Sequence, residues 1–133
     1  MNECVFCQIV SGNMESWKVY ETDTAYAFLD INPVNDFHTL VIPKKHYTNI
    51  FDVSERELLN VMSALKHVAD LYATRLGMND LQIVNSSGVH TQQDQFHLHF
   101  HIVPRHEGDG QDIEWSPSVH RRGWFDTLLA RLM

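Results

Sequence analysis

The longest periodic pattern in the chain is an apolar stripe between Ser54 and Gly77. Its members recur at alternating steps of four and three, which places them on one face of a helix: Leu58, Met62, Leu65, Ala69, Tyr72 and Leu76. The run Ser54-Glu55-Arg56-Glu57 has the capping-box form, in which a hydroxyl and a carboxylate satisfy free backbone N–H groups. Gly77 is a suitable C-terminal stop. The pattern therefore predicts one long helix that covers a flat apolar surface.

Shorter segments rich in β-branched and aromatic residues predict strands at residues 18–21, 25–29, 37–42, 81–85 and 96–103. A short helix is expected at residues 4–10, ending near Gly12. Strands around one long helix, without regular β-α-β alternation, favour an α+β domain with a mainly antiparallel five-stranded sheet. The segment 121–133 is expected to form a terminal amphipathic helix with its apolar side chains turned inward: Trp124, Phe125, Leu128 and Leu129.

Composition narrows the class of protein. With 133 residues and 44% hydrophobic residues, the chain is expected to form one domain over residues 1–133. A formal net charge of -7 argues against a nucleic-acid partner, because neutralising phosphates requires clustered Lys and Arg. No apolar stretch approaches the roughly 20 residues of a membrane span, and the N-terminus lacks a signal-peptide layout, so a cytoplasmic protein without a membrane partner is expected.

Three histidines alternate with apolar residues in the segment 96–103. If this segment is a strand, His97, His99 and His101 share one face, while Leu98, Phe100 and Ile102 share the other. One interpretation is a half-buried strand whose polar face has no chemistry. A second is a transition-metal centre, although the outer pair spans roughly 13 Å and cannot easily share one ion. A third is nucleophilic catalysis by the middle imidazole, which is largely neutral at pH 7.

The same residues carry a resemblance to a known family. His97 to Val103 fits the histidine-triad (HIT) signature of His, apolar, His, apolar, His and two apolar residues at every position. Residues 27–33 and 38–46 resemble the nucleoside-binding half of that family, and Ile83-Val84-Asn85 and Gln93-Asp94 match elements between the halves. The resemblance covers about residues 4–105 and leaves 106–133 as the variable C-terminal segment.

The resemblance implies a HIT-like fold that forms a homodimer by joining two sheets. It makes His99 the nucleophile, which would form a covalent nucleotidyl-histidine intermediate with a purine nucleotide, and it puts His101 and His38 beside the same phosphate. Gln93 would contact the phosphate or the leaving group. The apolar walls of the base pocket would be Phe6, Ile9, Phe28, Leu29 and Ile31, which otherwise would be interpreted simply as core.

Two further positions have competing interpretations. Asp30 falls where the family holds the ribose hydroxyls with an acidic side chain, but it also precedes Asn32-Pro33 and fits a turn residue. Asn85 matches a family position near the phosphates and ribose, but it could equally cap the loop that follows.

The chain departs from its eukaryotic relatives next to the triad. Asp94 stands where they usually carry Ser or Thr, and Gln95 stands where they have Val. A carboxylate beside a polyanion is unfavourable unless it points away or hydrogen-bonds to a histidine, so Asp94 is interpreted as an orienting residue whose backbone faces the phosphate. Trp115 and Trp124 lie in the variable segment and are expected at a dimer surface or in the core.

The only two cysteines form a Cys-x-x-Cys pair, and a reducing cytosol favours metal binding or thiol chemistry over a disulfide. Bacterial relatives complete a tetrahedral zinc site with two histidines. The matching set here is Cys4, Cys7, His46 and His97, a closed site of the structural kind. With zinc bound, His97 becomes a ligand and the catalytic pair is His99 and His101. Neither a catalytic metal nor an organic cofactor is expected.

The reaction implied is cleavage of the bond between a nucleotide α-phosphate and its leaving group. The small chain favours nucleoside phosphoramidates of the adenosine 5'-monophosphoramidate type, with diadenosine polyphosphates as the alternative substrate. A nucleotide-binding or interaction module with incidental activity is the alternative from another class, and a hydrolase that uses the triad as metal ligands is a third. The chain has no Gly-x-x-x-x-Gly-Lys-Ser/Thr loop, which argues against a P-loop ATPase or kinase.

Overall fold

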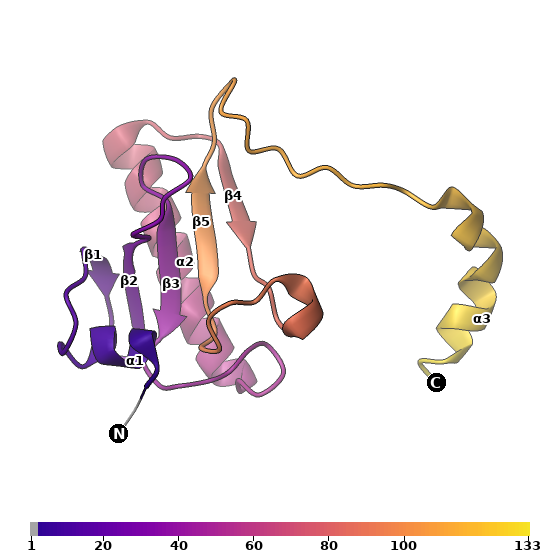
Figure 1. The fold of residues 1–133 in the computed structure, drawn as a ribbon, viewed down its shortest axis with the longest axis horizontal. Helices are drawn as coiled ribbons and strands as arrows, with labels where there is room; N and C mark the ends of the chain where they lie inside the picture. Colours follow the sequence, from indigo (N-terminus) through magenta and orange to yellow (C-terminus); the bar gives the residue numbers. More distant parts are fainter. Residues whose placement is uncertain (1–2) are drawn as a thin grey trace.

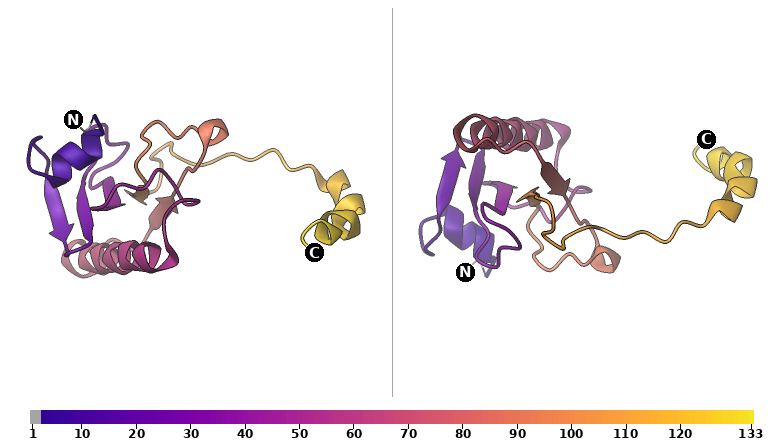
Figure 2. Two further views of the ribbon diagram at one scale, coloured as in Figure 1. Left: turned by 90° about the horizontal axis from the view of Figure 1, so that it is seen from below. Right: turned by 90° about the horizontal axis from the view of Figure 1, so that it is seen from above.

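A five-stranded antiparallel sheet lies between one long helix and one short helix in the computed structural model, which describes residues 3–133 (Figures 1 and 2). The strand order is β1-β2-β3-β5-β4. The strands are β1 Lys18–Glu21, β2 Ala25–Leu29, β3 Thr39–Pro43, β4 Leu81–Val84 and β5 Phe100–Pro104. The α-helices are α1 Val5–Val10, α2 Glu55–Leu76 and α3 Phe125–Ala130, with 3-10 turns at η1 Val89–Thr91 and η2 Val119–Trp124. The predicted α+β class and antiparallel sheet are confirmed.

Helix α2 begins and ends where its caps predict. The Ser54 hydroxyl accepts a hydrogen bond from the Glu57 N–H at 3.2 Å, and Gly77 adopts the left-handed conformation with φ 66°. The buried face runs along Val61, Ala64, Leu65, Val68 and Tyr72. Leu65 and Tyr72 of the predicted stripe belong to this face, whereas Val61 and Val68 are buried in place of their neighbours Met62 and Ala69. Leu58 and Met62 flank the contact as partly buried side chains.

Strand β2 is buried on both faces, so its alternate residues define two separate apolar clusters. Ala25 and Ala27 face α2, whereas Tyr26 and Phe28 face α1. The α1 cluster also contains Phe6, Ile9, Leu40 and Ile42. The face of the sheet that packs against α1 also carries the triad histidines.

Two predicted strands begin later than the sequence indicated. Strand β3 begins at Thr39, because Phe37 takes the left-handed conformation with φ 65° and turns the chain just before His38. Strand β5 begins at Phe100, so two of the three triad histidines precede it. Its partner β3 ends at Pro43, which has no N–H to continue the ladder. Leu98 N–H instead donates to the Tyr47 carbonyl at 2.6 Å.

The C-terminal segment after β5 leaves the sheet and ends in η2 and α3 (Figures 1 and 2). The inward packing predicted for Trp124, Phe125, Leu128 and Leu129 is wrong for this chain, since all four are exposed. Trp115 is 81% exposed, so a place in the core is wrong for both tryptophans. The C-terminal side chains do not pack on the sheet because α1 and α2 already cover its two faces. Across residues 3–133, no helix combines the length and apolar character needed to cross a membrane.

Candidate active site and metal centre

His99 has a defined proton position and a free ring nitrogen. Its Nδ1 lies 2.8 Å from the main-chain carbonyl of His97, and a carbonyl only accepts, so Nδ1 carries the proton. The lone pair is therefore on Nε2, which makes no hydrogen bond to any of residues 3–133. His99 is only 5% exposed, yet it lines a cavity. A buried imidazole with a free lone pair that opens into a cavity has the arrangement a nucleophile requires.

His38 and His101 form a second imidazole pair beside His99. The Val34 N–H donates to His38 Nδ1 at 3.1 Å, which leaves the His38 proton on Nε2. His38 Nε2 then donates to His101 Nδ1 at 2.9 Å, with Asp30 Oδ2 3.4 Å from the same nitrogen. The proton of neutral His101 consequently lies on its Nε2, available to a ligand oxygen.

Burial keeps both rings of this pair neutral. It lowers the pKa of His101 to about 4, and the neighbouring His99 and His38 add to this effect, while Asp30 and Asp94 oppose it. Burial also lowers the pKa of His38 against the opposing charge of Asp30. At pH 7 the pair therefore supplies hydrogen-bond donors rather than positive charges.

A cavity of about 180 Å³ adjoins His99. It contains all five predicted base-pocket residues as well as Asp30 and Asp94. Phe6, Ile9 and Phe28 are buried walls, whereas Ile31 is 74% exposed and belongs to the mouth. The sequence interpretation missed Val5, Met14, Glu15, Ser16, Asn32, Leu40 and Gln95. Leu40 was detectable in principle, since it pairs directly with Phe28 across strands β2 and β3.

Asn85 and Gln93 support the site without lining the cavity. Asn85 Nδ2 donates to the main-chain carbonyl of His99 at 2.9 Å. Gln93 is buried, its Oε1 accepts from the Gly88 N–H at 2.8 Å, and its Nε2 donates to the Thr48 carbonyl at 2.8 Å. Both amides thereby fix the loop before the triad, so the structure places Gln93 in loop contacts rather than open to a phosphate.

Asp94 lies at the cavity with a carboxylate that makes no hydrogen bond or ion pair to the rest of residues 3–133. The side chain is exposed and makes no hydrogen bond to a histidine, so the second of the two arrangements considered for Asp94, a hydrogen bond to a histidine, does not occur in this structure. Its charge nevertheless acts on His101.

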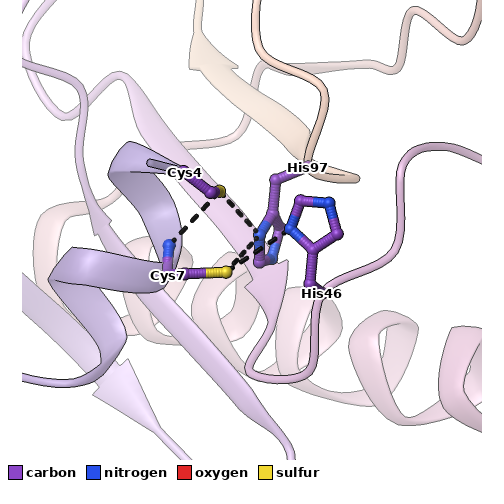
Figure 3. Close-up of side chains that lie close together, drawn as sticks. All are labelled: Cys4, Cys7, His46 and His97. Atoms are coloured by element: carbon purple, nitrogen blue, oxygen red, sulfur yellow. Dashed lines mark hydrogen bonds between the residues drawn. The ribbon is translucent and has the colours of Figure 1, made fainter. Parts of the chain in front are cut away.

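Cys4, Cys7, His46 and His97 converge at the start of α1 (Figure 3). Cys4 Sγ lies 3.3 Å from His97 Nδ1, and Cys7 Sγ lies 3.4 Å from His46 Nδ1 and 3.5 Å from His97 Nδ1. A tetrahedral zinc ion with ordinary bond lengths would separate sulfur and nitrogen ligands by about 3.5 Å. The four donors therefore fit a closed Cys2His2 zinc site.

His97 is also oriented for this role by its second nitrogen. Its Nε2 lies 2.8 Å from the Pro43 carbonyl and must donate to it, which leaves the Nδ1 lone pair directed at the thiols. His101 belongs to a different group, with Asp30 and His38. The outer histidines of the triad thus lie in separate clusters, in agreement with the strand-length argument against a shared ion.

The sequence interpretation also missed a polar network that joins two loops. Arg105 forms a two-pronged ion pair with Asp109, both contacts at 2.7 Å, and donates to Gln82 Oε1 at 2.7 Å. Asn35 Nδ2 donates to Asp109 Oδ2 at 2.9 Å. Since the Asn35 carbonyl accepts from the His38 N–H at 3.1 Å, the network fixes the loop that carries His38.

Comparison with known proteins identifies the family of this chain. A family model described as HIT domain matches residues 11–108. The chain is 42% identical to an uncharacterized HIT-like protein of Methanocaldococcus jannaschii, over 84% of this chain and 86% of the relative. It is 33% identical to an adenosine 5'-monophosphoramidase of Saccharomyces cerevisiae, over 84% of this chain and 69% of that enzyme.

A solved structure extends the likeness to the three-dimensional level. The crystal structure of a HIT family member from Bacillus subtilis matches with a TM-score of 0.87 and 31% identity, covering 99% of this chain and 98% of that one. The chain belongs to the HIT domain family.

Proposed function

We propose that this protein cleaves the bond between a nucleotide α-phosphate and an amine leaving group, through a nucleotidyl intermediate on His99. The observation that supports this most directly is the free Nε2 of His99, which opens into a cavity with apolar walls. The 33% sequence identity to an adenosine 5'-monophosphoramidase supports the same class of reaction.

The bound nucleotide would place its base between Phe6, Ile9 and Phe28 and its ribose beside Asp30. His99 Nε2 attacks the α-phosphorus, and the bond to the leaving nitrogen breaks with its electron pair on that nitrogen, which takes a proton from solvent. The Nε2–H of His101 donates to a phosphoryl oxygen as its charge increases. Water then attacks the phosphorus, releases the nucleoside monophosphate and one proton, and restores His99.

Zinc belongs to this proposal as a structural ion. The set Cys4, Cys7, His46 and His97 supplies four ligands and no open position, which fits a role in holding α1 against the segment before β5. When bound, zinc would fix the wall residue Phe6, which lies between the two cysteines in sequence. No step of the reaction passes through the ion.

We also propose that the chain acts as a homodimer. β4 is an edge strand whose Ile83 is half exposed, and edge strands offer unpaired backbone groups to a second sheet. The C-terminal segment exposes several large apolar side chains, which a second copy could cover: Trp115, Val119, Trp124, Phe125, Leu129 and Leu132. Sedimentation analysis checks this, and a monomer at micromolar concentration would contradict it.

The central experiment measures nucleoside monophosphate release from an adenosine phosphoramidate and from a diadenosine polyphosphate. Wild-type protein is expected to prefer the phosphoramidate, and His99→Ala is expected to lose turnover by several orders of magnitude while it still binds nucleotide. Trapping of a nucleotidyl adduct by mass spectrometry should succeed only when His99 is present. Equal turnover by the variant would refute the nucleophile, and inactivity of the wild type on both substrates would favour a binding module.

A further inference from the structure

Three carboxylates line the cavity beside His99, from Glu15, Asp30 and Asp94, and none of its lining residues is Lys or Arg. Phosphate sites usually contain such cations, because they neutralise the ligand. His99 is more than nine-tenths buried and lines this cavity with a free ring nitrogen, so the three carboxylates share a cavity with the proposed reaction centre. Their charge must therefore be compatible with the ligand that reacts there.

The three carboxylates are not equivalent. Asp30 Oδ1 accepts the Asn32 N–H at 2.8 Å, and its Oδ2 lies 3.4 Å from His38 Nε2, so both oxygens have neighbours. Glu15 belongs to the loop between α1 and β1. Asp94 makes no hydrogen bond or ion pair within residues 3–133, and it lines the same cavity as His99. Its negative charge also opposes the lowering of the His101 pKa. Glu15 also has no hydrogen bond or ion pair within residues 3–133, but Asp94 is the one of the two whose charge acts on His101, so Asp94 is the carboxylate we assign to the leaving group.

We propose that Asp94 selects leaving groups that carry or gain positive charge, an inference that rests on the proposed function. The favoured class is a nucleoside phosphoramidate of an amine, above all one with a second ammonium group, and polyphosphate leaving groups are disfavoured. When the phosphorus–nitrogen bond breaks, the nitrogen keeps the electron pair and takes one proton from solvent to give an amine, which binds a second proton and is an ammonium ion at neutral pH. When the leaving group is a phosphate, the electron pair stays on oxygen and negative charge increases beside the carboxylate.

The expected size of the selectivity follows from the solvent exposure of the Asp94 carboxylate. Asp94 is in contact with solvent, which screens its charge, so its selectivity should be that of one exposed charge pair, about fivefold in rate constant. Screening also predicts that the preference weakens between about 0.05 and 0.5 M salt.

The test compares kcat/KM for three substrates: the adenosine phosphoramidates of 1,3-diaminopropane and of butylamine, and diadenosine tetraphosphate. For each protein, the kcat/KM of one substrate is divided by the kcat/KM of another, and this ratio is compared between proteins. The comparison cancels the different intrinsic reactivities of the substrates. Asp94→Asn is expected to lower the diaminopropane-to-butylamine ratio about fivefold and to raise the relative rate on the tetraphosphate. Asp94→Glu should retain the wild-type ratios.

Asp70→Asn is the matched control, because it removes the same charge from α2 on the opposite face of the sheet. It should leave both ratios unchanged. Unchanged ratios in Asp94→Asn would overturn the inference while His99-dependent turnover left the proposed function standing. If the wild type turns over no substrate, the proposed function fails, and the inference is then tested by calorimetric binding of the same compounds. Equal affinity of the wild type for the two phosphoramidates would overturn the inference. Tighter binding of the diaminopropane phosphoramidate that is lost in Asp94→Asn would support it.

Discussion

The ring of Phe6 stands edge-on to the ring of His99, with centroids 5.3 Å apart and planes at 81°. Phe6 lies on α1 between Cys4 and Cys7, whereas His99 precedes β5. One aromatic contact thus connects the proposed zinc site, the proposed base pocket and the proposed nucleophile. Phe6 also packs edge-on against Phe28 at 5.6 Å, so its position depends on both the helix and the sheet.

Replacing Phe6 by Ala should impair both stability and substrate binding. The side chain is only 6% exposed, and loss of a buried Phe ring typically costs about 3–5 kcal/mol of unfolding free energy. KM should rise because the pocket loses a wall, and kcat should fall because His99 loses its neighbour. Denaturant unfolding and steady-state kinetics measure the two effects. Val68→Ala, on the α2 face, should destabilise the fold with KM unchanged; an equal rise in KM there would show that the Phe6 effect is general loosening.

Removing zinc should act on the fold rather than on the chemistry. A chelator is expected to lower Tm, and His46→Gln should do the same, since either change releases α1 from His97. Turnover measured at a temperature where circular dichroism shows a folded protein should persist. Immediate and complete loss of turnover in the folded, metal-free protein would assign the ion a part in the reaction.

Stability should fall in acid because of His101. Its pKa is about 4 in the folded protein and about 6.5 in the unfolded chain, so between these values the unfolded state binds more protons. The contribution of His101 is therefore fully present above pH 6.5 and is lost as the pH falls toward 4. Relative to His101→Gln, the wild type should lose roughly 1–3 kcal/mol of unfolding free energy over that interval. Parallel pH profiles for the two proteins would contradict this.

The ion pair between Arg105 and Asp109 should stabilise the loop that carries His38. The two-pronged contact and the Asn35 hydrogen bond hold the pKa of the Asp109 carboxyl well below its usual range. Asp109→Asn should therefore lower Tm several times more than Asp112→Asn, because Asp112 is 89% exposed and contacts Arg105 only from outside. Differential scanning calorimetry makes the comparison, and equal effects would show that the network does not fix the loop.

Local patterns in the sequence were sufficient for much of the fold. Ser54 and Gly77 bound α2 because capping depends only on neighbouring residues. β1 and β2 begin and end where the runs of β-branched and aromatic residues predict. The family resemblance supplied the set of site residues, and the structure brings four of them, Cys4, Cys7, His46 and His97, within reach of one ion.

The tertiary structure decided what depends on partners distant in sequence. The start of β5 depends on Pro43, 57 positions earlier, which has no N–H to extend the ladder. The position of the proton on His101 depends on its hydrogen bond to His38, 63 positions earlier in the chain. The sequence determined which side chains are present and their local periodicity. Proton positions, strand ends and the free carboxylate of Asp94 arise only from folding, because hydrogen bonds and burial join segments that are far apart in the chain.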